Sequence, residues 1–153
     1  MSYQDRLRVV GQQLDRGRYR AIVIIEVEGG LLVRATPHGS NLPAMLEILD
    51  SDFAKLLATH HRWRGWRERR TRNSLLPTGY EDFLRALGYW LDSEGASWVT
   101  ISELVSMIAV HGWTGREGYR GVQVVPFELF LTGEDIETHL EEAFRRRKPR
   151  RRL

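Results

Sequence analysis

Apolar residues recur at helical spacing in two stretches of the chain, one at its start and one in its second half. The positions are Tyr3, Leu7, Val10 and Leu14 in the first stretch, and Tyr80, Leu84, Leu87 and Leu91 in the second. Side chains three and four residues apart lie on one face of a helix. The pattern therefore predicts two amphipathic helices, each with one face in a hydrophobic core.

Short segments rich in β-branched and apolar residues follow each helix and predict strands. In the first half these are 20–28, 31–35 and 45–49, and Gly29-Gly30 between the first two is typical of a two-residue hairpin turn. In the second half they are 98–105, a second strand that reaches Val110, and 122–131, which Pro126 places at a sheet edge or a bulge. A closing helix is expected after Asp50-Ser51 and another after 132–135.

The two halves repeat each other at an offset of 77 positions, and ten residue pairs in the first 33 positions are identical without a gap. The pairs are Tyr3/Tyr80, Asp5/Asp82, Leu7/Leu84, Arg8/Arg85, Gly11/Gly88, Leu14/Leu91, Asp15/Asp92, Ile24/Ile101, Glu26/Glu103 and Val33/Val110. Such self-similarity indicates one supersecondary unit that occurs twice. Gly11 and Gly88 fall inside the helices, where glycine is unfavourable, and this indicates a close backbone approach at each.

The predicted fold class is therefore α+β, a tandem internal duplication of an α-β-β-β-α unit packed about a pseudo-twofold axis. The first unit spans residues 1–72, a linker spans 73–79, the second unit spans 80–148, and a basic tail ends the chain at 149–153. We expect the two units to pack as one compact domain. Six strands in one continuous sheet and two packed three-stranded sheets are both compatible with the pattern.

Charge is distributed unevenly, although the net charge is only +3. Residues 62–72 hold six arginines and one acid, and residues 145–152 hold six arginines and one lysine, whereas the rest of the chain has 10 basic and 19 acidic residues. The chain has no cysteine, no apolar signal core at its start and no apolar run of membrane-spanning length. These features predict a cytoplasmic protein that does not enter a membrane.

The basic stretches are candidates for nucleic-acid binding, because guanidinium groups neutralise phosphates and tryptophan rings stack on bases. The candidate residues are Arg62, Trp63, Arg64, Trp66, Arg67, Arg69, Arg70, Arg72, Arg145, Arg146, Arg147 and Lys148. A structural interpretation competes with this one: the tryptophans would cover the core while the arginines are solvated or pair with the acidic body.

Replacing Arg64, Arg67 and Arg70 with alanine is expected to weaken binding of labelled DNA or RNA without unfolding the protein. Three lost phosphate contacts would lower the slope of log K against log salt by about 2.7 for duplex DNA. Fluorescence anisotropy at several salt concentrations measures the change, with a 1–144 truncation as the control for the tail. Unchanged binding by the triple variant would remove this stretch as a binding site.

Glu26 and Glu103 share strand parity with apolar residues and would face the core. If a pseudo-twofold axis brought the two carboxylates together, their repulsion would raise a pKa enough for acid–base chemistry. Alternatively, each carboxylate pairs with an arginine such as Arg34 or reaches solvent at a strand end.

No other arrangement of residues indicates catalysis, a cofactor or a metal site. His139 and Glu142 have a spacing that could ligate a metal ion, but no second ligand pair accompanies them, and neither a nucleophile motif nor a phosphate-binding glycine loop is present. An enzyme would require either Glu26 and Glu103 or His139 and Glu142 to be buried and convergent.

The α-β-β-β-α order resembles that of the double-stranded RNA-binding domain and, at the level of fold alone, secretion-chaperone-like α+β folds. The former family binds phosphates with a lysine-rich start to its second helix. The matching positions here begin with Asp52 in one unit and Glu134-Asp135 in the other, and this acidity argues against phosphate binding there. The sequence favours a non-enzymatic interaction module that binds a protein partner or self-associates, with a nucleic-acid-associated protein as the alternative.

Overall fold

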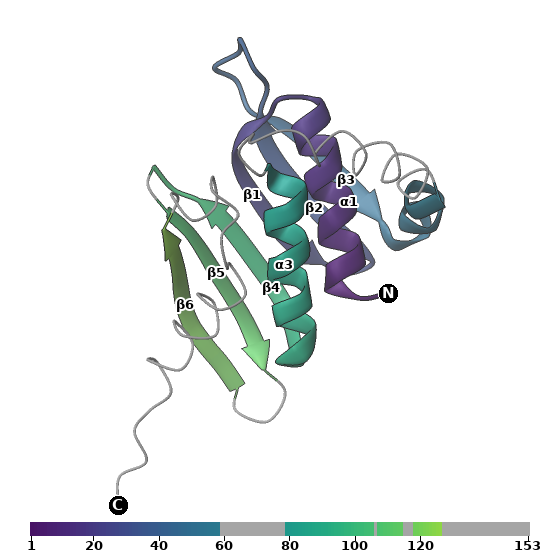
Figure 1. Cartoon of the computed structure of the whole chain (residues 1–153), viewed down its shortest axis with the longest axis vertical. Helices are drawn as coiled ribbons and strands as arrows, with labels where there is room; N and C mark the ends of the chain where they lie inside the picture. Colours follow the sequence, from purple (N-terminus) through teal and green to yellow (C-terminus); the bar gives the residue numbers. More distant parts are fainter. Residues whose placement is uncertain (59–78, 106, 115–117, 127–153) are drawn as a thin grey trace, which may run out of the picture.

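The computed structural model describes residues 1–58, 79–105, 107–114 and 118–126 (Figure 1). The elements with full bounds in these ranges are α1 (Tyr3–Arg16), β1 (Arg20–Val27), β2 (Gly30–Thr36), β3 (Ala44–Leu49), α3 (Tyr80–Ser93), β4 (Ala96–Glu103), β5 (Met107–Thr114) and β6 (Gly118–Pro126). Residues 50–58 are also helical. The α+β fold class is thus confirmed. Both the predicted closing helix after 132–135 and the basic tail fall outside the described residues.

All six strands form a single antiparallel sheet in the order β3-β2-β1-β4-β5-β6. Pairing of β1 with β4, with Ile24 opposite Ile101, joins the strands of the two halves at the centre. Figure 1 shows α1 and α3 side by side across one face of the sheet. Of the two arrangements left open by the sequence, the continuous sheet is therefore the one that forms.

The core lies between this helical layer and the sheet. It contains the apolar face of each helix, including Leu7, Leu84 and Leu87, together with Ile24 and Ile101 from the central strands. Each of these five side chains is at most 1% exposed, so the helical periodicity and the strand alternation that the sequence shows identify the core correctly.

Two glycines allow the helices to touch backbone to backbone. A Cβ on Gly11 would lie 2.6 Å from the Cα of Glu81, and one on Gly88 would lie 2.6 Å from the Cα of Gln4. Because rising residue numbers in α1 meet falling numbers in α3, the helices are antiparallel. The predicted close approach is confirmed, and its partner is the other helix.

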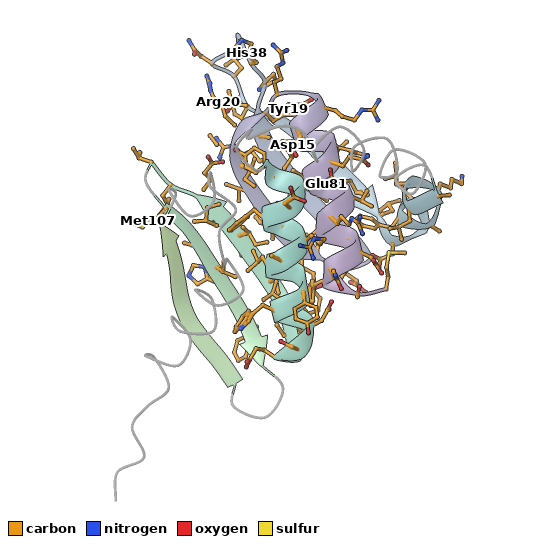
Figure 2. All side chains as sticks on the ribbon, in the orientation of Figure 1. Asp15, Tyr19, Arg20, His38, Glu81 and Met107 are labelled. Carbon is orange, nitrogen blue, oxygen red and sulfur yellow. The ribbon has the colours of Figure 1, made fainter. Side chains whose placement is uncertain are left out.

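The helices also cap each other. The carboxylate of Asp15, near the end of α1, accepts hydrogen bonds from the backbone N–H groups of Tyr80 (2.8 Å) and Glu81 (3.0 Å). In the same way Asp92, near the end of α3, accepts from Tyr3 (2.8 Å) and Gln4 (3.0 Å). The first turn of a helix has unpaired N–H groups, and each of these carboxylates accepts from two of them in the neighbouring helix. Figure 2 labels Asp15 on α1 and Glu81 on α3.

One local expectation differs from the structure. The last strand of the second half begins at Gly118, before the predicted start at 122, and residues 127–131 of the predicted strand lie outside the described ranges. The register with β5 explains the earlier start, because Thr114 already pairs with Gly118. After α1 the left-handed residue is Arg18 (φ 51°), and after α3 it is Gly95 (φ 64°).

Candidate functional site

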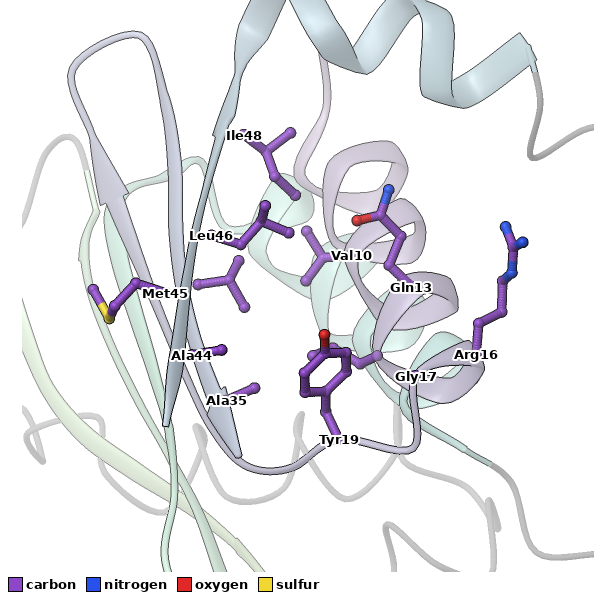
Figure 3. Close-up of a pocket in the computed structure, with 12 residues that line it drawn as sticks. Val10, Gln13, Arg16, Gly17, Tyr19, Ala35, Ala44, Met45, Leu46 and Ile48 are labelled. Atoms are coloured by element: carbon purple, nitrogen blue, oxygen red, sulfur yellow. The ribbon is translucent and has the colours of Figure 1, made fainter. Parts of the chain in front are cut away.

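A cavity of about 530 Å³ lies between the second half of α1 and the outer strands β2 and β3 (Figure 3). Val10 and Leu14 of α1 form one wall, and Leu46 and Ile48 of β3 form the other. Figure 3 shows Tyr19 at one end of the cavity and Met45 on the opposite side of the strand, pointing away from it. The remaining lining residues are Gln13, Arg16, Gly17, Val33, Ala35 and Ala44.

The cavity forms because β3 extends the sheet beyond the layer of helices. Its inward-facing residues pair with the inward-facing residues of β2, Leu46 with Val33 and Ile48 with Leu31. Val33 is buried, but Leu46 next to it is 49% exposed. Apolar side chains at this edge therefore face a hollow, whereas side chains nearer the centre of the sheet pack against a helix.

The opposite surface of β3 also exposes apolar groups. Met45 is 59% exposed and Leu49 is 44% exposed, while Leu42 in the preceding loop is 78% exposed. Single exposed apolar residues are ordinary, but several of them on one short strand and the loop before it are typical of a surface that contacts another molecule. We call β3 and the cavity beside it the β3 edge site.

Backbone hydrogen bonding shows which groups of β3 point away from β2 within the described part of the chain. Asp50 N–H donates to the carbonyl of Gly29 (2.8 Å), whereas Leu49 N–H donates to the Asp52 carboxylate (3.3 Å). Residues of an antiparallel strand alternate between bonding to the neighbouring strand and pointing away from it. The N–H and C=O groups of Met45 and Glu47 share the parity of Leu49, so they point outward from the sheet.

Charged groups line the hollows of the β3 edge site. Arg16 lines the first cavity from the end of α1, and Figure 3 shows its side chain on the side of the helix away from β3. A second hollow of about 280 Å³ is lined by Glu47, Asp52 and Lys55 together with Leu56.

Glu26 and Glu103 lie on the helix-covered face as predicted, but they do not converge. Because Ile24 pairs with Ile101, the two glutamates lie on opposite sides of this central pair. Four strand residues separate them, which is roughly 13 Å along the sheet at about 3.3 Å per residue. The two carboxylates are therefore too far apart for strong mutual repulsion.

Each glutamate instead fills an irregularity in the neighbouring strand. The pairing of β1 shifts between Arg20 and Val23, and the freed N–H of Ile22 donates to Glu103 (3.1 Å). The pairing of β4 shifts between Ser97 and Thr100, and the freed N–H of Val99 donates to Glu26 (3.2 Å). A buried N–H without an acceptor is costly, so the glutamates stabilise both bulges.

Tyrosine hydroxyls complete these two clusters. Tyr80 donates to Glu103 at 2.5 Å, and Tyr3 donates to Glu26 at 2.5 Å and 2.9 Å to its two oxygens. Burial raises the pKa of both tyrosines well above the ordinary value of about 10, and the hydrogen bond and charge of the adjacent glutamate raise it further. The guanidinium of Arg6, 3.4 Å from Glu26 and above the Tyr3 ring, opposes part of this rise for Tyr3.

The structure thus locates two of the residues singled out in the sequence, Glu26 and Glu103, and places both in structural clusters. The basic candidates, Arg62 to Arg72 and Arg145 to Lys148, lie outside the described residues, as do His139 and Glu142. Within the described ranges, no group of three or more His, Cys, Asp or Glu residues could hold a metal ion. No helix in those ranges is long and apolar enough to cross a membrane.

Sequence reasoning missed the β3 edge site. The run Met45-Leu-Glu-Ile-Leu49 is typical of a strand that is buried on both sides, and only the strand order shows that it lies at an edge. The one charged residue in this run, Glu47, was the available signal, because a charge inside an apolar strand is a feature of edges.

Comparison of the chain with protein-family models, with curated proteins and with solved structures finds no match.

Proposed function

We propose that this chain is a non-enzymatic interaction module that binds another polypeptide at the β3 edge site. One observation carries the proposal: β3 has outward-pointing backbone groups on Met45 and Glu47, and an apolar cavity lies along the same strand. Extended peptides bind exposed sheet edges through main-chain hydrogen bonds, and alternate side chains enter adjacent pockets. Both elements of that binding mode are present here.

The proposal includes a scaffold made by tandem duplication, with the two units packed about a pseudo-twofold axis. Reciprocal contacts support it: Asp15 caps α3 as Asp92 caps α1, and Gly11 meets α3 as Gly88 meets α1. Glu26 and Glu103 fill bulges in each other's strands. In this scheme residues 1–72 and 80–148 are the two units, the linker lies between them, and the protein is cytoplasmic.

The same contacts favour a binding role over catalysis. Asp15 and Asp92 cap helices, and Glu26 and Glu103 fill bulges. Glu81, which is buried, forms an ion pair with Arg8. These are structural tasks. An acid–base site would need a carboxylate beside a cavity with a partner for proton transfer. Nucleic-acid binding by the basic stretches stays a prediction, which the salt-dependent titration of the triple arginine variant tests.

A photo-crosslinking amino acid at position 45 is expected to form covalent adducts with a bound polypeptide. Position 25 is the matched control, because Ile25 is also an exposed apolar residue (38%) but lies on β1 at the centre of the sheet. Gel mobility and mass spectrometry would identify adducts after irradiation of the purified protein alone and in extract from its native host. Adducts from position 45 and none from position 25 are the expected result. Equal labelling at both positions, or none at either, would contradict the proposal.

A further inference from the structure

The part of the β3 edge that can pair with another strand is short and sharply bounded. Met45 and Glu47 each direct an N–H and a C=O outward. Beyond them, Pro43 has no N–H, and Leu49 has already given its N–H to Asp52. A strand added here can therefore exchange complete pairs of hydrogen bonds only with Met45 and Glu47, on either side of Leu46.

We propose that the occupant of this edge is a second copy of the chain, paired antiparallel through β3 with Leu46 on the two-fold axis. The proposal rests on the interaction role proposed above and names its partner. In this register Met45 faces the partner's Glu47 and Glu47 faces the partner's Met45, so four main-chain hydrogen bonds form. The contact is isologous and closes after two copies.

The ends of the edge favour this register over its neighbours. It places Pro43 opposite the partner's Leu49, so the two positions without an available donor meet each other. A shift that placed Glu47 opposite the partner's Glu47 would set like charges face to face, and it would pair Met45 with a residue whose N–H is occupied. Complete hydrogen bonding and charge therefore select one alignment.

Side chains on the cavity side match in the same alignment. Leu46 meets the partner's Leu46, and Ala44 meets the partner's Ile48, so apolar groups line the whole inner face of the junction.

Sedimentation velocity and light scattering of the purified chain would measure the association. The expected mass is twice 17.8 kDa at about 50 µM, with dissociation on dilution. Glu47→Pro removes an N–H that the monomer's own sheet does not use. The dimer therefore loses two hydrogen bonds, one from each copy, and association should weaken about 30-fold. Glu47→Ala keeps the N–H and serves as the matched control, with association at least as strong as in the wild type.

Single cysteines test the register without relying on the proline variant. The chain has no cysteine, so Leu46→Cys and Met45→Cys each introduce a single thiol. Directly opposed non-hydrogen-bonded residues have Cα atoms about 4.5 Å apart, within the range for a disulfide, whereas the diagonal between two copies of position 45 is about 7–8 Å. Leu46→Cys should therefore oxidise to a covalent dimer at least tenfold faster than Met45→Cys. This order is the opposite of what exposure alone would give, because Met45 is the more exposed of the two side chains.

A monomeric wild type at about 50 µM, or equal oxidation of the two cysteine variants, would overturn the proposed dimer. The broader role can be distinguished from it. A monomer that still forms adducts from position 45 with a different polypeptide would keep the interaction module and reject the second copy. A monomer without any adduct would reject both.

Discussion

Raising the pH above about 10 is expected to destabilise this protein steeply, by about 2.7 kcal/mol per pH unit at most. Tyr3 and Tyr80 are the source, because burial, and then the hydrogen bond and charge of the adjacent glutamate, raise the pKa of both hydroxyls above the unfolded value. Above the unfolded pKa the unfolded chain releases these protons and the folded chain keeps them. Each tyrosine then removes about 1.4 kcal/mol of stability per pH unit, and below that pKa its contribution is fully present.

Urea unfolding at intervals from about pH 9 to pH 12 measures this slope. Tyr80→Phe removes one of the two ionisable groups, so the slope it shows should be about half that of the wild type. At pH 7 this variant also loses about 1 kcal/mol, because the hydrogen bond to Glu103 is gone.

Tyr89→Phe is the matched control, because Tyr89 lies on the same helix and is 52% exposed. Its alkaline slope should equal that of the wild type. A wild type whose stability is flat up to about pH 12, or equal slopes for the Tyr80 and Tyr89 variants, would show that the buried clusters do not control alkaline stability.

Alanine at Gly11 or at Gly88 is expected to lower the free energy of unfolding by about 2–3 kcal/mol. The new Cβ would lie 2.6–2.7 Å from backbone atoms of the opposite helix. At Gly11 these atoms are the Cα and N of Glu81 and the carbonyl oxygen of Tyr80. At Gly88 they are the Cα and N of Gln4 and the carbonyl carbon of Tyr3. Backbone atoms cannot rotate away, so the helices must separate. The better helix propensity of alanine recovers about 1 kcal/mol and does not reverse the sign.

Urea unfolding at neutral pH measures both glycine variants. Tyr89→Ala, next to Gly88 but exposed, should change the free energy by no more than about 0.5 kcal/mol. The double variant should lose less than the sum of the single losses, because one separation of the helices accommodates both methyl groups. If either single variant were as stable as the wild type, the helices would not be in backbone contact at that glycine.

The helical face and the strand alternation were readable in the sequence because both follow from local geometry. Leu7 and Leu84 lie in helical repeats. Ile24 shares strand parity with Ile22, and Ile101 shares it with Val99. All six of these side chains are buried. The two strands predicted from residue 98 to Val110 are present in the structure as β4 and β5. The glycine inside each helix indicated a close approach but not its partner.

The candidate site could not be read in the same way. Whether β3 lies at an edge depends on strand order, and strand order is decided by contacts between residues far apart in the chain, here the pairing of β1 with β4. The roles of Glu26 and Glu103 depend on bulges at Ile22 and Val99, which no local pattern marks.

The described helices and strands, their apolar faces and the likeness of the two halves could be read from the chain, since each is a property of neighbouring residues or of direct comparison. The three-dimensional contacts were needed to show that the six strands make one sheet and that Asp15, Asp92, Glu26 and Glu103 cap helices and fill bulges. They were also needed to show that Met45 and Glu47 point away from the sheet on its outermost strand. Register and strand order depend on which distant groups satisfy each other's hydrogen bonds, and several pairings can bury the same apolar faces.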